Sequence, residues 1–272
     1  MRSACARHAF EPTSQRRWPP LRHGACVRES VRRQPGHAIR LVETSTLSPS
    51  VRGLVFQPLE GPLTYLAGES VDLTVLCPTG LAVRRPYSFA SACGRLELGR
   101  FEVAVTRVER GPTSSALHAL PLGAEILAQG PKASALCPTP DERARRLLVV
   151  ATGSGLAPFR ALVQERMAAG SNAATGVLFG CRTRADILWR PELEAWPHAP
   201  LCARVEITLS RPDADWTGRS GYVQRHLEPM VRAIDPELLM ICGLAPMVDE
   251  VEHLARTLGV SARAIRTEAY DR

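Results

Sequence analysis

The fold is decided at residues 147–158, which read Leu-Leu-Val-Val-Ala-Thr-Gly-Ser-Gly-Leu-Ala-Pro. The first five residues form an unbroken apolar run, which is typical of a strand buried on both faces of a parallel sheet. A glycine turn follows, and residues 157–169 have the composition of a helix. This order lets a pyrophosphate approach the backbone and the helix N-terminus closely. An ordinary strand–helix turn would look similar, and Pro158 stands in place of the usual third glycine, so both interpretations stay open here.

The sequence after this stretch alternates apolar runs with one more helical segment. We expect strands at 176–180, 205–210, 238–242 and 265–270, and a helix at 246–258. Strands that alternate with helices predict a doubly wound parallel sheet. A polar, proline-marked stretch at 138–146 precedes them as a linker, so the α/β domain is expected at 140–272.

The sequence before the linker has a different pattern. Turn signals such as Gly61-Pro62 and Gly130-Pro131 separate short runs rich in valine, leucine and isoleucine. The runs lie at 38–45, 51–57, 69–76, 86–91, 95–107 and 124–129. Short strands with turns at this spacing predict a closed antiparallel β-barrel. We place this all-β domain at 36–139.

Residues 1–35 predict no domain. They carry eight arginines and two glutamates, and they lack the apolar core of a signal peptide. Such a composition cannot bury a core, so a disordered extension is expected. A start codon set too far upstream and a transit peptide are the alternatives. Six of the seven net positive charges fall in this segment, so the rest of the chain does not imply nucleic-acid binding.

The remaining composition excludes several kinds of site. No apolar run reaches the ~20 residues of a membrane span. The spacing of the eight cysteines fits neither a zinc site nor iron–sulfur ligation. The histidines are scattered without ligand spacing, so no metal site is expected. Nothing supports disulfides, and we therefore expect reduced thiols and a cytoplasmic protein.

Two motifs in the barrel segment suit a flat, phosphorylated cofactor. Arg-Pro-Tyr-Ser at 85–88 offers a guanidinium for a phosphate, a ring for stacking and a hydroxyl for a polar ring atom. Gly-Pro-Thr-Ser-Ser at 111–115 offers hydroxyls and backbone N–H groups for a second phosphate contact. Taken singly, the first is also compatible with an arginine beside a strand aromatic, and the second with a plain turn.

The order of five motifs resembles that of the ferredoxin–NADP reductase superfamily over residues 37–272. The motifs are those at 85–88 and 111–115, the strand–glycine loop–helix at 147–158, Cys242-Gly243 and Glu268-Ala269-Tyr270. The resemblance implies a two-domain protein, in which an antiparallel barrel binds FAD and a doubly wound α/β domain binds NADP or NAD.

The resemblance also implies roles for the barrel residues. Tyr87 would stack on the isoalloxazine ring, and Ser88 would hydrogen-bond near its N5 atom. Arg85, Ser114 and Ser115 would hold the pyrophosphate. Pro86 and Gly111 complete the expected FAD-binding residues.

In the α/β domain, the resemblance places the coenzyme pyrophosphate over the loop at 152–155 and the nicotinamide beside Cys242 and Gly243. The expected residues of the loop are Thr152, Gly153, Gly155 and Pro158. The ring of Tyr270 would cover the flavin until the nicotinamide displaces it, and the carboxylate of Glu268 would lie near the reacting atoms. In many members of the superfamily the chain ends at this aromatic residue, whereas two more residues follow Tyr270 in this sequence. The implied catalytic residues are Ser88, Cys242, Glu268 and Tyr270; without the resemblance, Cys242 reads as a core residue.

Coenzyme choice rests on Ser210, Arg211, Arg219 and Tyr222. Members that use NADP place a hydroxyl residue and basic residues around the ribose 2′-phosphate, and bidentate arginines suit that group. No acidic residue ends the strand at 205–210, where it would favour NAD. Two aspartates lie in the same loop, and the amino-acid sequence of this loop also resembles that of NADH-using oxygenase reductases. NADP is therefore favoured and NAD stays open.

The implied function is an FAD-dependent oxidoreductase that passes electrons from NAD(P)H to a separate one-electron acceptor such as ferredoxin or flavodoxin. The sequence holds no iron–sulfur ligand pattern, so the acceptor is expected to be another protein or domain. Three alternatives stay open. They are an NADH-dependent reductase component dedicated to one oxygenase, a non-catalytic electron-transfer subunit of a larger complex, and a dehydrogenase without flavin, which would leave the barrel unexplained.

Overall fold

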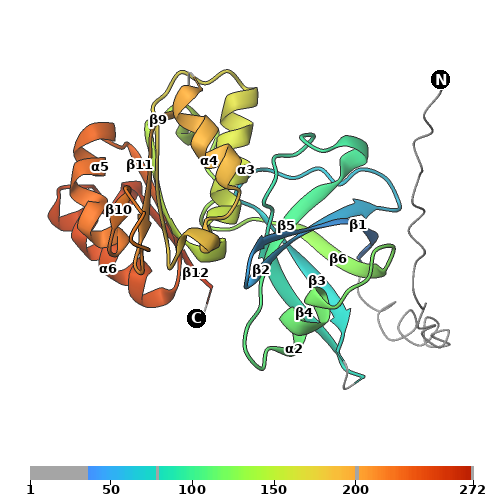
Figure 1. Cartoon of the computed structure of the whole chain (residues 1–272). Coiled ribbons are helices and arrows are strands. Elements are labelled where there is room, and N and C mark those ends of the chain that lie inside the picture. Colours follow the sequence, from blue (N-terminus) through green and yellow to red (C-terminus); the bar gives the residue numbers. More distant parts are fainter. Residues whose placement is uncertain (1–35, 78–79, 200–201, 271–272) are drawn as a thin grey trace, which may run out of the picture. The chain divides into compact units, whose positions relative to one another are not determined.

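The computed structural model describes residues 36–77, 80–199 and 202–270, and the side chains of residues 202 and 203 are not described. The Arg-rich extension expected at 1–35 lies outside these residues. The described chain forms an antiparallel sheet followed by a parallel one (Figure 1). The domain boundary predicted at 139/140 falls between the last strand of the first sheet and the first strand of the second.

The antiparallel sheet has the strand order β4-β3-β6-β1-β2-β5. Its strands are β1 His37–Ser48, β2 Val51–Pro58, β3 Ser70–Leu76, β4 Ala82–Ser88, β5 Phe101–Thr106 and β6 Glu125–Lys132. A bridge between Phe89 and Val103 joins the chain after β4 to β5, and the Ala90 amide donates to the Glu102 carbonyl at 2.7 Å. The sheet therefore closes on itself, which confirms the predicted antiparallel barrel.

Three segments of the barrel differ from the prediction. The strand expected at 86–91 begins and ends earlier, as β4 at 82–88. The strand expected at 95–107 is shortened to β5, because Leu98 and Gly99 turn the chain with positive φ angles of 58° and 68°. The segment at 111–115 opens a short helix, α2 Pro112–His118, rather than a plain turn. Pro112 suits this start, since the first residue of a helix needs no N–H partner.

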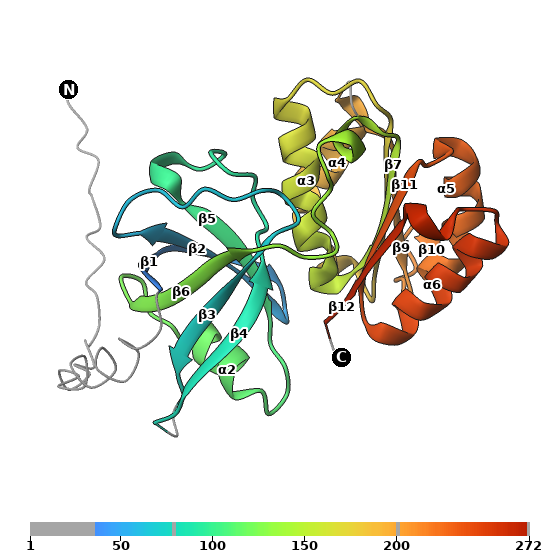
Figure 2. The same cartoon turned by 180° about the vertical axis from the view of Figure 1, so that it is seen from behind.

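The parallel sheet has the order β10-β9-β8-β7-β11-β12. Its strands are β7 Leu147–Thr152, β8 Thr175–Cys181, β9 Cys202–Leu209, β10 Arg219–Ser220, β11 Leu238–Gly243 and β12 Ile265–Ala269. The helices are α3 Leu156–Ala168, α4 Arg190–Ala195, α5 Leu227–Ile234 and α6 Ala245–Thr257. Helices α3 and α4 cover one face and α5 and α6 the other (Figures 1 and 2). This arrangement confirms the doubly wound α/β domain.

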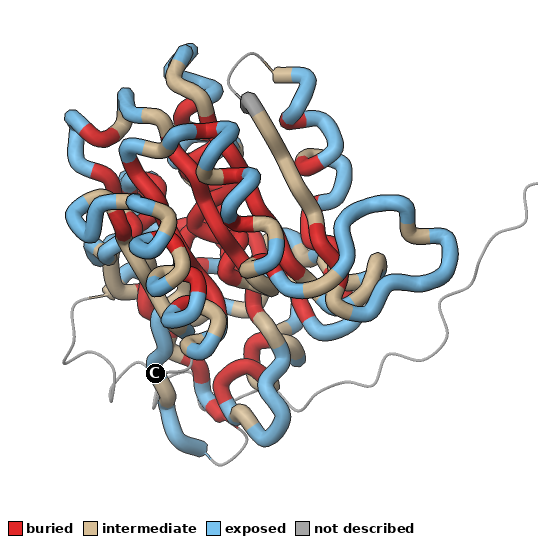
Figure 3. The backbone as a smooth tube through the Cα atoms, turned by 90° about the vertical axis from the view of Figure 1, so that its left-hand side faces the viewer, coloured by how far each residue is buried: buried red, intermediate tan, exposed pale blue. Residues whose placement is uncertain are grey.

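The apolar run in β7 explains why both faces are covered. Leu147, Val149 and Ala151 pack in the core on the α3 side, whereas Leu148 and Val150 pack in the core on the α5 and α6 side. A strand that alternates between two cores has no polar face, as the unbroken run predicts. Figure 3 shows the same result, with buried residues running through the strands of the sheet.

Helix α3 is buried on more than one side. Its residues share a core with the parallel sheet and also with barrel residues, among them Val51, Ala67 and Ala104. Burial of most of its length accounts for the weak amphipathic pattern of its sequence. The two domains are therefore joined through a common apolar core around α3.

Candidate functional site

The strand order reverses between β7 and β11, and ligands of open α/β sheets bind at such a point. The loop after β7 lies against the end of β11, because a Cβ atom on Gly155 would come 2.3 Å from the Cys242 carbonyl oxygen. Only glycine permits this approach. Gly155 thus packs the loop onto the neighbouring strand.

Gly153 has a different environment in the same loop. Its φ is +53°, and a Cβ atom there would meet nothing within 4 Å. Beside it, the hydroxyl of Thr152 is buried and has no hydrogen-bond partner among the described residues. Buried polar atoms normally have partners. The open space and the unpaired hydroxyl fit the coenzyme pyrophosphate that the sequence predicts over this loop.

The last strand brings the C-terminal motif to the same edge of the sheet. Strand β12 pairs with β11 in parallel, with Glu268 opposite Cys242, and the Tyr270 amide donates to the Gly243 carbonyl at 3.1 Å. The Tyr270 hydroxyl lies 3.1 Å from the Ser88 hydroxyl at the end of β4. The residue is 42% exposed, so its ring lies at the surface of the site.

The structure therefore brings together four residues from distant parts of the sequence: Ser88, Cys242, Glu268 and Tyr270. They are the predicted catalytic residues, and they come from both domains. The coenzyme loop at 152–155 joins them through the contact of Gly155 with Cys242.

Burial sets the protonation of this group. Burial raises the pKa of Glu268, and the hydroxyls of Ser134 and Ser88 partly oppose the rise. Burial also raises the pKa of the Cys242 thiol, which is neutral at physiological pH. The site thus holds one carboxyl that gains a proton more readily than an ordinary glutamate, beside hydroxyl groups and a neutral thiol.

The predicted FAD residues lie on the barrel side. Tyr87 is half-buried on β4, and burial raises its pKa to about 12. Arg85 and Pro86 are exposed on the same strand. A guanidinium, an aromatic ring and a hydroxyl therefore occur in succession along β4, which fits a flavin nucleotide.

The second predicted phosphate contact is built differently from expectation. The Ser114 hydroxyl is turned into its own loop, where it accepts from the Val108 amide and donates to the Gly111 carbonyl, both at 3.1 Å. Ser115 is half-buried in α2. The backbone amides at the start of α2 are the groups that this segment offers to a phosphate.

The predicted 2′-phosphate residues lie at the β9–β10 edge of the sheet. Arg211 is exposed, and Arg219 pairs with Glu206 at 3.2 Å. Burial would raise the pKa of Glu206, but the guanidiniums of Arg204 and Arg219 hold it below its usual value. Ser210 follows β9, where its amide donates to the Cys181 carbonyl, and Tyr222 is exposed.

Sequence reasoning missed two hydroxyl residues beside the site. The Thr106 hydroxyl at the end of β5 donates to the Ser154 hydroxyl at 2.8 Å, and so links the barrel to the coenzyme loop. Ser134 lies beside Glu268 and donates to the Gly68 carbonyl at 2.7 Å. Neither residue has a local pattern that marks it, because each contact joins segments far apart in the sequence.

Other kinds of site are not found in the described part of the chain. No group of three or more histidine, cysteine or acidic residues there is placed to hold a metal ion. None of its helices is both long and apolar enough to cross a membrane.

Comparisons with known proteins match the two halves of the chain separately. Residues 38–136 match the oxidoreductase FAD-binding domain and residues 149–253 match the oxidoreductase NAD-binding domain. Ferredoxin–NADP reductase B of Sorangium cellulosum is 42% identical over 240 residues, covering 85% of this chain and 96% of that protein.

A further relative and a solved structure also match the chain. The ferredoxin–NAD(+) reductase component of the alkene monooxygenase system of Xanthobacter autotrophicus is 30% identical over 245 residues, covering 87% of this chain and 69% of that protein. The FAD/NAD-binding domain of nitric oxide dioxygenase from Vibrio cholerae has the same fold, with a TM-score of 0.77 at 18% identity, over 87% of this chain and 99% of that one.

Proposed function

The chain belongs to the ferredoxin–NADP reductase superfamily, and from this premise we propose that it passes electrons from NADPH to a separate one-electron carrier protein such as ferredoxin or flavodoxin. It is an FAD-dependent NAD(P)H reductase. We propose the kind of electron acceptor, the preference for NADPH over NADH and the roles of individual residues.

The observation that carries the proposal is the convergence of Ser88 with Cys242, Glu268 and Tyr270. FAD, when bound, accepts a hydride from the nicotinamide and releases electrons one at a time. The chain supplies orientation and electrostatics. Ser88 would present its hydroxyl to the reacting edge of the flavin, and Tyr270 would occupy the nicotinamide position until coenzyme arrives. Glu268 lies beside them with a pKa that burial raises, and the buried domain contact excludes water.

The preference for NADPH is supported by the charges of the 211–219 loop. Asp213, one of the two acids that argued for NAD, pairs with Arg184 at 2.8 Å and is thus engaged by a guanidinium. Arg211 has no ion pair within the described residues and is exposed. We propose that Arg211, with Ser210, binds the 2′-phosphate and that Arg219 is shared between this phosphate and Glu206.

The coenzyme proposal is tested with Arg211→Ala. A charged hydrogen bond contributes ~1.5–3 kcal/mol, so kcat/KM for NADPH should fall roughly 10- to 150-fold, with little change for NADH. The control is Arg232→Ala on α5, which removes another exposed arginine, one that is paired with Glu228. Equal losses with both coenzymes would refute the NADP assignment.

The separate carrier is supported by the name of the 42% identical relative, a ferredoxin–NADP reductase. A second candidate is a reductase component of an oxygenase, which the 30% identical relative favours. The purified protein should reduce ferricyanide with NADPH, and ferredoxin or flavodoxin should mediate electron transfer to cytochrome c. If only an oxygenase component accepts electrons, the second candidate holds. A protein that cannot oxidise NAD(P)H at all would instead be a non-catalytic subunit.

We further propose a cytoplasmic location. Five cysteines in the described residues are free thiols, at positions 77, 93, 137, 181 and 242, and free thiols are stable in a reducing compartment. Fractionation of the native cells, with detection of the protein in the periplasm or medium as the contrary outcome, tests it.

A further inference from the structure

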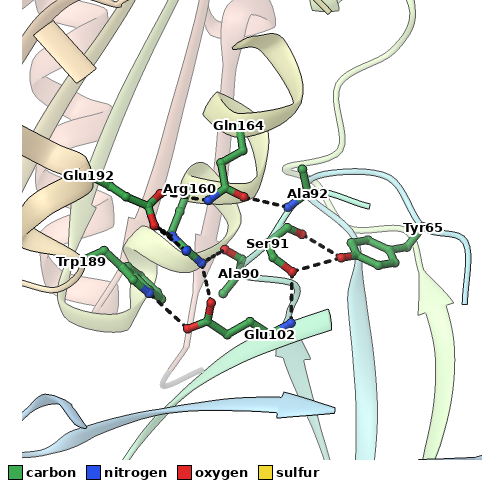
Figure 4. Close-up of polar contacts among 9 residues, drawn as sticks. All are labelled: Tyr65, Ala90, Ser91, Ala92, Glu102, Arg160, Gln164, Trp189 and Glu192. Carbon is green, nitrogen blue, oxygen red and sulfur yellow. Dashed lines mark hydrogen bonds and ion pairs between the residues drawn. The ribbon is translucent and has the colours of Figure 1, made fainter. Parts of the chain in front are cut away.

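A buried group of charged residues joins the two domains away from the reacting residues (Figure 4). Arg160 of α3 donates through Nη1 to Glu102 of β5 at 2.6 Å, and through Nε and Nη2 to Glu192 of α4 at 2.9 and 2.5 Å. Arg160 and Glu102 are 9% and 7% exposed. One guanidinium thus holds a carboxylate of the barrel and a carboxylate of the α/β domain together.

Neutral groups complete the hydrogen bonds of these charges. Trp189 donates from Nε1 to the second oxygen of Glu102 at 3.1 Å, and its ring lies under the Arg160 guanidinium at 4.7 Å. Gln164 donates to the second oxygen of Glu192 at 2.9 Å and accepts from the Ala92 amide at 3.0 Å. We call these five residues, Glu102, Arg160, Gln164, Trp189 and Glu192, the interdomain charge group.

The group costs backbone strain. Trp189 has φ 44° and ψ 41°, a left-handed conformation that residues other than glycine rarely adopt. A buried ion pair gains little stability over apolar packing, since desolvation of the charges offsets their attraction. Stability alone is therefore a weak reason for this arrangement, whereas its directional bonds fix geometry closely.

The residues that the group fixes are close in sequence to both predicted cofactor sites. Arg160 also donates to the Ala90 carbonyl at 2.7 Å, and Ala90 lies two residues after Ser88. Arg160 itself is in the second turn of the helix that the coenzyme loop opens. The group thus connects the segment after β4, which lies next to the proposed flavin site, with helix α3, which begins at the proposed nicotinamide site.

The strand β5 makes this tie at two points. Glu102 near its start contacts Arg160, and Thr106 at its end donates to Ser154 in the coenzyme loop. Two contacts along one strand restrict rotation of the domains as well as their separation.

We propose that the interdomain charge group is a positioning group, which sets the approach of the nicotinamide to the flavin and thereby the rate of hydride transfer without touching either cofactor. The inference rests on the superfamily function of the chain. Effective transfer needs reacting atoms within ~3–3.5 Å of each other, and a misplacement of about 1 Å can cost a factor of 100 in rate. Small relaxation of the domain contact is therefore amplified at the reacting atoms.

The test compares Arg160→Lys and Trp189→Phe with the wild type. Lysine keeps the charge but cannot hold both carboxylates in a planar fork. Phenylalanine keeps the ring under Arg160 and removes only the bond to Glu102. The control is Val251→Ala, which removes buried methyl groups from the far side of the parallel sheet and lowers Tm without touching the group.

Four quantities are measured for each protein: bound FAD, Kd for NADP⁺, the charge-transfer absorbance of the flavin–nicotinamide complex, and the anaerobic single-turnover rate of flavin reduction by NADPH. We expect Arg160→Lys to lose at least tenfold in rate and most of the charge-transfer absorbance, with FAD content and Kd within twofold. Trp189→Phe should lose about threefold in rate. Val251→Ala should keep the wild-type rate.

Three outcomes would overturn the proposal. They are unchanged rate and absorbance in both variants, an equal loss of rate in Val251→Ala, and a loss confined to FAD content or coenzyme affinity. If Arg160→Lys does not fold, Trp189→Phe and Gln164→Met decide by the same criteria. Failure of the wild type to accept electrons from NAD(P)H would refute the function itself, and is separate from these outcomes.

Discussion

At the scale of single residues, we propose that the reacting site depends on a tyrosine that competes with the coenzyme. Tyr270 is 42% exposed, and it is held by a backbone bond to Gly243 and by contacts of its hydroxyl with Ser88 and with the Cys242 thiol. If its ring covers the flavin, as the superfamily resemblance implies, each molecule of coenzyme that binds must displace it.

Replacement of Tyr270 by serine should therefore tighten the binding of NADP⁺ and NAD⁺, with a larger relative gain for the poorer coenzyme. Apparent affinity falls with the fraction of protein in which the site is open, and the variant removes the closed form. Turnover should slow, because product leaves more slowly. Difference spectra give the two Kd values. Unchanged affinities and an unchanged flavin spectrum would show that the ring does not cover the flavin.

Glu268→Gln should separate stability from catalysis. The pKa of Glu268 is raised in the folded protein. Above that folded value the buried carboxylate is charged and costs stability; below the pKa of an ordinary glutamate it is neutral in both states and costs nothing. The variant should thus gain Tm at about pH 8, and the gain should shrink toward about pH 5. Hydride transfer should slow with little change in coenzyme Kd.

The control for this pH dependence is Glu228→Gln on the exposed face of α5, where an i,i+4 pair with Arg232 is present. Loss of such a pair changes stability by only ~0.3–0.5 kcal/mol. A Tm gain in Glu268→Gln that is the same at every pH would contradict the raised pKa.

At the scale of elements, the loop between β7 and α3 uses its two glycines for different purposes. Gly155→Ala should lower the Tm of the coenzyme-free protein, since its Cβ would overlap the Cys242 carbonyl of β11. Gly153→Ala meets no atom of the chain and bears only a left-handed backbone, which costs ~1–2 kcal/mol. It should nevertheless raise KM for NADPH about tenfold or more, because its methyl group enters the coenzyme space.

The measurements are thermal unfolding and steady-state kinetics with FAD content checked in both variants. The expectation fails for Gly153 if its alanine variant binds coenzyme normally. It fails for Gly155 if the alanine variant keeps the wild-type Tm.

The elements also show what could be predicted from sequence. The buried strand at 147–151 and the helix at 246–258 match β7 and α6 within two residues, because periodicity and flanking turns are local signals. The strand at 95–107 was predicted too long, because Leu98 and Gly99 turn the chain with positive φ angles, and the close approach of Gly99 to Pro62 is not a local signal. Helix α5 and the two-residue β10 were not predicted at all.

The residues of the site also include some that could be predicted from the sequence and some that could not. Ser88, Cys242, Glu268 and Tyr270 were predicted from motif order, and the structure brings them together. Thr106 and the charged residues around Arg160 were not predicted, because an Arg in a helix and a Glu in an apolar strand reveal their partners only when the two domains are in contact.

At the scale of the whole molecule, catalysis is expected to need only residues 36–272. The composition of 1–35 gives that segment no core of its own. Deletion of residues 1–35 should leave FAD content and ferricyanide reduction within about twofold of the full chain, a difference of ~0.4 kcal/mol. Both are read from the visible spectrum. Loss of FAD on deletion would mean that the segment supports the barrel.

The charges around Arg160 limit how the two domains can be exchanged between related proteins. Glu102 belongs to the barrel, whereas its side-chain partners Arg160 and Trp189 belong to the α/β domain, so the barrel by itself does not balance the buried charge of Glu102. In a chimera that joins this barrel to the α/β domain of a relative without Arg160, Glu102 would be buried with no guanidinium to pair with. An unpaired buried charge costs ~3–5 kcal/mol. Recombination between relatives can therefore exchange these two domains only when the residues at positions 102, 160, 189 and 192 remain compatible with one another.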